Sequence, residues 1–223
     1  MSEFERWWNT RGEVVEPFNE RRGGQSGVER VSDPLLGLLY IKRQAGHIFR
    51  SFRYPLGRPT AIRERDAYGA FARLGIKTPE LVFAEARKQD GRWQAVLVTK
   101  NLEGFSTLWS WYENGGPARL GPEQHRLFLQ KLGALLGLLH RHRWCHGGLH
   151  FLHLYVTPGH GNQLPDIAFL DLERASKKLT RQQAARKDWR SLQRHAPVFQ
   201  GVPVLSEAEW AVMRAAHQQA ISE

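Results

Sequence analysis

The order of apolar and polar positions predicts strands and one helix in the first half of the chain. Short strand-like runs occur at residues 38–42, 80–84 and 94–99, and Asp90-Gly91 is a turn signal between the last two. Apolar positions recur at helical spacing over residues 60–74, with charged residues between them. This half is therefore expected to form a small sheet accompanied by a helix.

The second half has mainly helical patterns. Residues 122–142 carry a broad apolar face of leucines, and residues 180–223 also read as helical. Two stretches between them, 149–156 and 167–172, are short and strand-like.

Length and composition fit such a plan. A chain of 223 residues with 41% hydrophobic and 11% aromatic residues is long and apolar enough to form a core. The order of elements predicts an α+β fold with two lobes, a β-rich lobe at residues 1–103 and a helical lobe at residues 104–223. Residues 1–20 are polar and aromatic, and we expect a lead-in segment around Trp7 and Trp8.

The formal net charge of +10 favours anionic partners such as nucleotides, nucleic acid, acidic lipids or phosphorylated sugars. The basic residues are spread along the chain, so a merely solvating role is an equally good interpretation. No recognised nucleic-acid module occurs, and we expect no nucleic-acid partner. The single cysteine, Cys145, excludes an internal disulfide and fits a reducing compartment. The charged amino terminus and the lack of an apolar run of about 20 residues predict a cytoplasmic protein.

Phosphoryl transfer needs groups that hold phosphates, and the first half contains candidates. The segment of residues 21–28 is rich in glycine, whose lack of a Cβ lets the backbone approach a phosphate. An ordinary glycine turn is the competing interpretation. Lys42 ends an apolar strand, where its ammonium group can reach phosphates, and Glu64 on the next helix can pair with it. A surface lysine and an exposed helix glutamate are the alternatives for these two residues.

Asp171 is the strongest single candidate in the second half. It follows the apolar run Ile167–Leu170 and is expected at a strand end that faces a cleft. A carboxylate there suits magnesium, which prefers oxygen ligands, whereas a helix N-cap or turn aspartate is the alternative. The imidazole of His153 is a poorer magnesium ligand and can hydrogen-bond a phosphate instead.

Several histidines lie close to Cys145 in the sequence. They are His140, His142, His146, His150 and His153. A zinc site is the competing interpretation, but the paired spacing of structural zinc sites is missing and no His-Glu-x-x-His occurs. A hydrolase with a serine or cysteine nucleophile is not favoured either, because the sequence has no nucleophile elbow.

Taken in order, these parts resemble the lipopolysaccharide kinase family (Kdo/WaaP type), and within it the InaA-like proteins. The resemblance runs from about residue 18 to about residue 195. The motifs that carry it are Asn19–Val28, which includes Arg22, then Lys42, Arg63–Ala67, Leu74–Pro79, Leu97–Leu102, Leu139-His140, His146–His153, Leu170–Ala175 and Lys187-Asp188. The resemblance implies a protein-kinase-like fold, with ATP and Mg²⁺ as cofactors.

The resemblance also implies roles for residues of the first half. Lys42, paired with Glu64, would hold the phosphates of ATP. The residues that would cover these phosphates are Gly23, Gly24, Ser26 and Gly27.

In the second half, Asp171 would bind magnesium, and His153 stands where a kinase has a metal-binding asparagine. Asp188 would brace the backbone of the catalytic loop. The family phosphorylates heptose or Kdo sugars of the lipopolysaccharide inner core, so the partner would be an anionic glycolipid or sugar. The protein would then contact the cytoplasmic side of the inner membrane peripherally.

The departure from the family pattern is Gly147-Gly148, where a kinase has Arg-Asp. A general base contributes about 10²- to 10⁴-fold in rate, so its loss predicts a slow kinase or an inactive one. His146 or His150 could replace it because imidazole titrates near neutral pH. We therefore expect a sugar kinase, with a ligand-binding pseudokinase of a stress or envelope pathway as the alternative. The sequence leaves the oligomeric state open.

Overall fold

The computed structural model describes residues 1–21, 23–51, 54–159 and 163–223. Arg22, which belongs to the glycine-rich segment, lies outside the described residues. The chain divides into two compact units. The first unit comprises Met1–Gly69 and Pro79–Leu102, and the second unit comprises Ala70–Thr78 and Glu103–Glu223. Within the described part of the chain, no helix is both long and apolar enough to cross a membrane.

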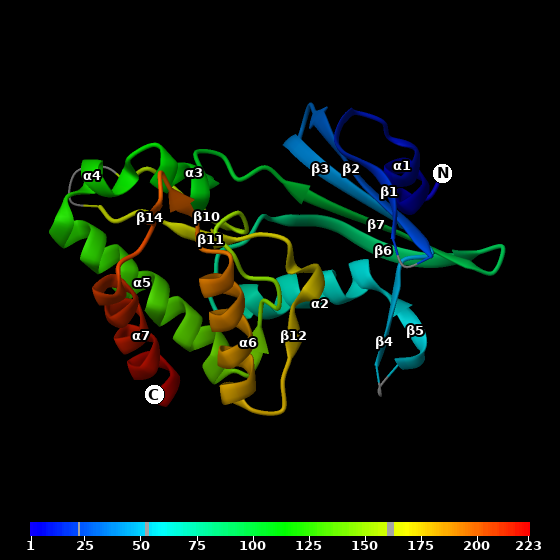
Figure 1. The fold of residues 1–223 in the computed structure, drawn as a ribbon. Helices are drawn as coiled ribbons and strands as arrows, with labels where there is room; N and C mark the ends of the chain where they lie inside the picture. Colours follow the sequence, from blue (N-terminus) through cyan, green and yellow to red (C-terminus); the bar gives the residue numbers. More distant parts are fainter. Residues whose placement is uncertain (22, 52–53, 160–162) are drawn as a thin grey trace. The chain divides into compact units, whose positions relative to one another are not determined.

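The first unit is built on a five-stranded antiparallel sheet (Figure 1). Its strands, in the spatial order β1-β2-β3-β7-β6, are β1 (Glu13–Arg21), β2 (Gly24–Asp33), β3 (Gly37–Ala45), β7 (Arg92–Lys100) and β6 (Leu81–Gln89). The three strands expected from the sequence are confirmed as β3, β6 and β7, with Asp90 and Gly91 at the turn. A further hairpin of β4 (Ile48–Ser51) and β5 (Tyr54–Pro59) was not expected.

The lead-in expected at residues 1–20 is a capped helix followed by an edge strand. Helix α1 (Glu3–Asn9) begins with a capping box, in which the Ser2 hydroxyl accepts from the Glu5 amide and the Glu5 carboxylate accepts from the Ser2 amide. A helix this short is unstable alone, so its packing on the sheet holds it. Its side chains Phe4 and Trp7 are buried against Leu39, Ile41, Val96 and Val98.

Helix α2 (Thr60–Arg73) confirms the helical spacing of residues 60–74. Because side chains alternate along a strand, Lys42 and Gln44 of β3 point away from the face that α1 covers. The Gln44 Oε1 atom accepts hydrogen bonds from the Thr60 hydroxyl and the Ala61 amide, which fixes the amino end of α2 on this second face.

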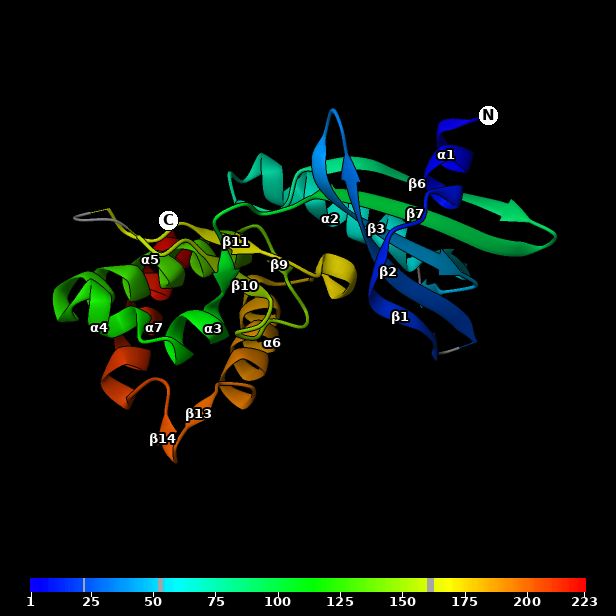
Figure 2. The ribbon, with the colours of Figure 1, turned by 90° about the horizontal axis from the view of Figure 1, so that it is seen from above.

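The second unit is mainly helical (Figure 2). Its helices are α3 (Leu108–Glu113), α4 (Gly116–Leu120), α5 (Pro122–Arg141), α6 (Arg181–Arg194) and α7 (Glu207–Ser222). Helices α5 and α7 lie side by side (Figures 1 and 2) and approach closely. A Cβ atom at Gly133 of α5 would lie 2.2 Å from the Met213 carbonyl oxygen of α7, so glycine is what permits this approach.

Short strands position the loops of the second unit. β8 (Ser106–Thr107), β10 (Leu154–Val156) and β11 (Ile167–Phe169) form one small sheet, β9 (Trp144–Cys145) pairs with β12 (Ser176–Lys177), and β13 (Val198–Phe199) pairs with β14 (Val202–Pro203). The predicted strand over 149–156 was wrong in its first part, because Leu149 and Phe151 fill the core from a loop. The predicted strand over 167–172 ends at Phe169, and the helical prediction for 180–223 missed the β13–β14 hairpin.

Candidate active site

A buried carboxylate holds the backbone of the loop His146–His153, here called the catalytic loop. Asp188 of α6 is 0% exposed and accepts hydrogen bonds from the backbone amides of His146 at 2.7 Å and Gly147 at 2.8 Å. A third donor reaches it from α5, since His140 Nε2 lies 3.1 Å from Asp188 Oδ2. A buried charge is costly unless it is paired and hydrogen-bonded, and these three donors meet that need.

The network continues into the last helix. The other ring nitrogen of His140, Nδ1, lies 2.8 Å from Nε2 of His217 on α7. Burial, followed by the neighbouring His140, lowers the pKa of His217 to about 4, so His217 is neutral at pH 7. His217 was not singled out from the sequence, and nothing in its local pattern links it to a residue 77 positions earlier.

His146 is fully buried and is committed to the backbone of the neighbouring strand end. Its Nε2 atom lies 2.8 Å from the carbonyl oxygen of Leu170, and because a carbonyl only accepts, Nε2 carries the proton. Nδ1 is buried and has no hydrogen-bond partner among the described residues. Burial lowers the pKa of His146. This neutral side chain therefore ties the catalytic loop to the segment that leads into Asp171.

His153 and Asp171 form a pair with the chemistry of a cation site. His153 Nδ1 donates a hydrogen bond to the carbonyl oxygen of Gly148 at 2.8 Å. Nε2 of the same ring lies 3.4 Å from Asp171 Oδ2, so the imidazole and the carboxylate are close enough to interact. Imidazole nitrogens and carboxylate oxygens are both ligand atoms that divalent cations accept.

The backbone of Asp171 is held in an uncommon conformation. Its φ of 56° and ψ of 64° lie in the left-handed region, which few residues other than glycine adopt. Such strain persists where the surroundings enforce it, and it concentrates at functional sites. Here β11 ends just before Asp171 and a 3₁₀ turn, Leu172–Arg174, begins just after it.

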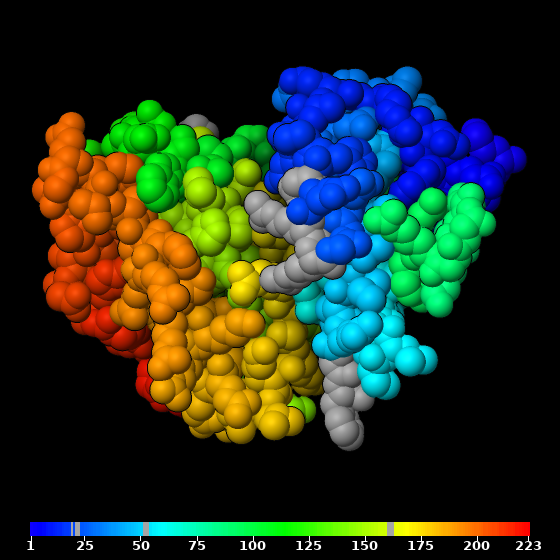
Figure 3. Space-filling model, turned by 45° about the vertical axis from the view of Figure 1, so that its right-hand side comes forward, coloured from blue at the N-terminus to red at the C-terminus, as the bar shows by residue number. Residues whose placement is uncertain are grey.

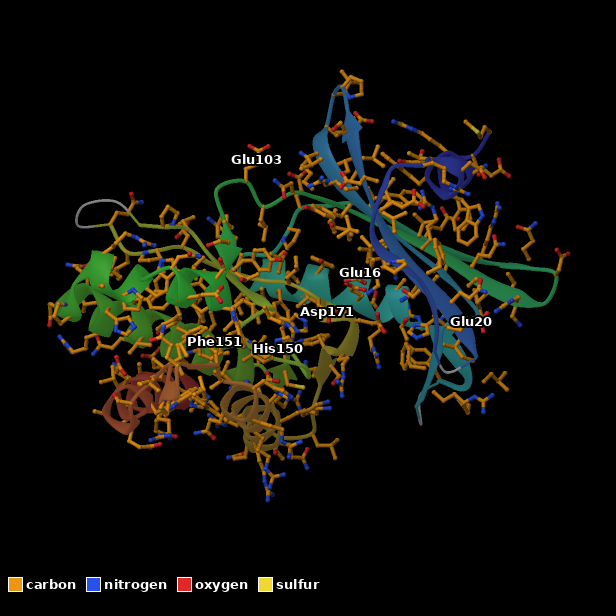
Figure 4. All side chains as sticks on the ribbon, turned by 45° about the horizontal axis from the view of Figure 1, so that its top comes forward. Glu16, Glu20, Glu103, His150, Phe151 and Asp171 are labelled. Atoms are coloured by element: carbon orange, nitrogen blue, oxygen red, sulfur yellow. The ribbon has the colours of Figure 1, made fainter. Side chains whose placement is uncertain are left out.

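His150 lies among other imidazoles of the second unit. Its ring centroid is 3.6 Å from that of His153 and 5.7 Å from that of His195. Burial, then repulsion by His153, His195 and His146, lowers the pKa of His150 to about 4. His150 is therefore neutral at pH 7 and can accept a proton. Figure 4 labels it together with Phe151 and Asp171.

The two glycines of the catalytic loop differ in what they require. Gly147 has a φ of +83°, and a Cβ there would lie 2.3 Å from the carbonyl oxygen of Arg174, so a side chain is excluded. Gly148 has no left-handed conformation. Among the described residues, the one heavy atom near a Cβ at Gly148 is Arg174 Cδ at 3.4 Å, an ordinary contact. The fold therefore requires glycine at 147 and tolerates a side chain at 148.

The candidates of the first unit form a second group. Lys42 Nζ lies 2.8 Å from Glu64 Oε2, and both side chains are largely buried, at 15% and 4% exposure. The ion pair implied by the resemblance is thus present. The ion pair holds the ammonium group of Lys42 in one position, whereas the side chain of an exposed lysine is free to move.

The glycine-rich segment is part of the sheet. Gly23 occupies the turn between β1 and β2, while Gly24, Ser26 and Gly27 lie within β2. A Cβ at Gly24 would lie 2.6 Å from the His47 backbone nitrogen, and one at Gly27 would lie 2.7 Å from the Phe18 ring. Close packing is thus a sufficient reason for both strand glycines.

The histidine cluster has no arrangement that fits a zinc site. Over the ranges that the structure covers, no group of three or more His, Cys, Asp or Glu side chains could hold a metal ion. Cys145 is buried, and its thiol lies 3.4 Å from the Ser176 carbonyl oxygen. Burial, followed by the negative charge of Asp188, raises the pKa of this thiol.

Comparison with known proteins shows the family of the chain. The model of the Lipopolysaccharide kinase (Kdo/WaaP) family matches residues 5–217, and the chain belongs to this family. Protein InaA of Escherichia coli (strain K12) is 35% identical over 213 residues, which cover 96% of this chain and 94% of the relative.

The fold agrees with a solved structure. WaaP in complex with acyl carrier protein matches with a TM-score of 0.74 at 18% identity, over 98% of this chain and 83% of that one. The chain thus has the α+β, protein-kinase-like fold expected from the sequence, with a sheet-rich amino-terminal region and a helical carboxyl-terminal part.

Proposed function

We propose that this protein is an ATP-dependent kinase of a sugar hydroxyl, carried by the lipopolysaccharide inner core. The observation that carries the proposal is the His153–Asp171 pair, which brings an imidazole and a carboxylate to 3.4 Å, with the imidazole on a loop whose backbone Asp188 holds. Family membership supports the same reaction class.

Each unit has its own task in this proposal. In the first unit, Lys42 holds the α- and β-phosphates of ATP, and Glu64 keeps its ammonium group in place. Gly23, Gly24, Ser26 and Gly27 contribute the backbone that covers these phosphates. In the second unit, Asp171 and His153 hold Mg²⁺, whose charge offsets the charge that develops on the transferred phosphoryl group.

On the acceptor side, His150 is a better candidate base than His146. His146 is 0% exposed and its Nε2 proton is donated to Leu170, so it positions the loop. His150 is half-buried and neutral at pH 7. A pKa of about 4 makes it a weak base, but loose phosphoryl-transfer transition states depend more on positioning and charge than on proton removal.

A pseudokinase is the second candidate function, and Gly148 is the observation that favours it. The backbone at this position accepts a side chain, yet the chain has no carboxylate there. In this reading Lys42 and Asp171 serve nucleotide binding alone.

Thermal melting with ATP and Mg²⁺ tests nucleotide binding, which both candidates require. A ligand at 100 times its Kd stabilises the folded state by about 2.7 kcal/mol, which is roughly 5 to 10 °C for a chain of this size. Asp171→Ala should abolish the Mg²⁺-dependent shift. Asp166→Ala is the matched control, because Asp166 is also a carboxylate of the second unit but pairs with Lys77 and Lys131.

Phosphate transfer to core oligosaccharide then separates the two functions. Turnover that Asp171→Ala removes and Asp166→Ala keeps supports the kinase. A shift without turnover selects the pseudokinase, and no shift in the wild type refutes both.

A further inference from the structure

Basic residues occur along the whole chain, but acidic residues are scarce in one segment around helix α6, so much of the net charge lies there. Residues 174–194 contain eight basic residues and one acidic residue, a net charge of +7 out of the chain's +10. The one acidic residue, Asp188, is buried and faces the catalytic loop. The basic residues, here called the α6 basic face, are Arg174, Lys177, Lys178, Arg181, Arg186, Lys187, Arg190 and Arg194.

The α6 basic face takes no part in the ion pairs between described residues. No ion pair joins any residue of the α6 basic face to a carboxylate among the residues described, whereas Arg126 and Lys131 of neighbouring α5 pair with Glu123 and Asp166. Burial, then repulsion by Lys178 and Arg174, lowers the pKa of Lys187. Lys187, Lys178 and Arg174 therefore repel one another, while the buried Asp188 attracts Lys187.

Three of these charges lie on one exposed side of α6, whereas Lys187 and Arg174 lie close to Gly147 and Gly148. Arg186, Arg190 and Arg194 follow one another at four-residue spacing and are exposed, while the opposite side buries Ala184 and Leu192. Like charges at this spacing destabilise a helix. An external anion would offset this repulsion.

A cavity of about 640 Å³ lies at the amino end of α6. Arg141, Arg143, Arg181, Leu179 and Glu223 are among its lining residues. Arg141 pairs with Glu223 at 3.6 Å and Arg181 donates to the Ile221 carbonyl oxygen, so two of the three guanidinium groups already have partners and the cavity is not counted in the docking surface.

Apolar side chains are exposed at both ends of the same helix. Leu179, just before α6, is 83% exposed, and Val198 and Val202 of the β13–β14 hairpin after α6 are 58% and 66% exposed. The hairpin projects beyond the helices in Figure 2, and the amber and orange residues of α6 and the hairpin form one continuous surface in Figure 3. Basic residues flanked by exposed aliphatic ones are typical of segments that lie on a lipid surface. Exposed aliphatic side chains next to basic ones gain from contact with lipid chains, which favours a lipid surface over nucleic acid.

We propose that the α6 basic face, with Leu179 and the hairpin valines, docks the second unit onto an anionic lipid surface. This proposal deepens the membrane-bound acceptor of the proposed function by naming the docking surface. It does not require phosphate transfer, so it is tested without nucleotide or sugar.

Co-sedimentation with vesicles tests it. The full chain should bind vesicles of phosphatidylcholine with 30% phosphatidylglycerol, should not bind pure phosphatidylcholine, and should bind less as salt rises. Each basic residue at such a surface is worth about fivefold in affinity, so Arg186→Gln, Arg190→Gln and Arg194→Gln together should weaken binding about a hundredfold. Leu179→Ser should weaken it roughly tenfold.

The matched control removes the same charge elsewhere. Arg73→Gln, Lys88→Gln and Arg92→Gln change three exposed basic residues outside the α6 basic face and should leave vesicle binding nearly unchanged. If the triple variant fails to fold, the single variant Arg190→Gln replaces it, with an expected fivefold loss of affinity for the anionic vesicles. Equal losses in the two triple variants, no vesicle binding by the wild type, or displacement from vesicles by duplex DNA would each overturn the proposal. A failure of vesicle binding has no effect on the change in melting temperature with ATP and Mg²⁺. The docking proposal and the proposed function can therefore fail independently.

Discussion

Under the proposed kinase function, Gly148→Asp should raise the rate of phosphate transfer. The position is not left-handed, and a Cβ there meets only an ordinary 3.4 Å contact with Arg174 Cδ in the described chain. The substitution should therefore change stability by no more than about 1 kcal/mol. A restored general base is worth about 10²- to 10⁴-fold in rate, which corresponds to a barrier lower by roughly 3 to 5 kcal/mol.

The assay is initial-rate phosphate transfer from ATP to core oligosaccharide, with thermal melting to show that each variant is folded. Gly148→Asn is the matched control, because it adds a side chain of the same size without a basic carboxylate. A gain in Gly148→Asp alone would show that acceptor activation limits the wild type. Equal rates in the wild type and both variants, with the nucleotide shift intact, would refute the reasoning.

The remaining predictions concern the catalytic loop and its supports. Gly147→Ala should cost about 2–3 kcal/mol of unfolding free energy, measured by urea denaturation, because it combines a φ of +83° with a backbone clash. Asp188→Ala should cost roughly 3–5 kcal/mol in the same measurement, since it leaves two buried amides and a histidine unpaired. His217→Ala should lower stability by about 1–3 kcal/mol, and an unchanged melting temperature would contradict the network. Stability should fall as pH drops from about 6.5 toward 4. In this range the unfolded chain protonates His150 and His217 at their ordinary pKa, whereas burial holds the pKa of both residues near 4 in the folded protein. The melting temperature of His217→Asn should therefore depend less on acid pH.

Local patterns predicted the elements but not their long-range contacts. The strands β3, β6 and β7 and helices α2 and α5 follow from periodicity, since each has a clear apolar side. The capping box of Ser2 and Glu5 is a readable signal that the sequence interpretation overlooked. The loop around Phe151 was mistaken for a strand because buried loop residues have the same apolar composition as buried strands.

The candidate site could be predicted only in part, again because local patterns do not contain long-range contacts. Glu64 lies on α2 and Asp171 closely follows β11, where spacing and motif order carry information. Lys42 was expected to end its strand, but β3 continues to Ala45, because Arg43, Gln44 and Ala45 also pair with β7. The partners of the histidines could not be predicted from local patterns. His195 contacts His150, and His217 contacts His140, only because α6 and α7 pack in the second unit. Likewise, the need for glycine at 147 but not at 148 depends on the Arg174 backbone, which no local pattern contains.

The hydrogen bond between His217 and His140 has a consequence for the order of events during synthesis. The catalytic loop begins at His146, but the carboxylate that braces it is itself supported by a residue 71 positions later in the chain. At about 5–20 residues per second, translation needs roughly 4 to 14 s to cover that distance. During this interval the sheet of the first unit can already fold, whereas the catalytic loop still lacks the hydrogen bond that His217 supplies to its support. The catalytic loop therefore reaches its final set of contacts late in synthesis.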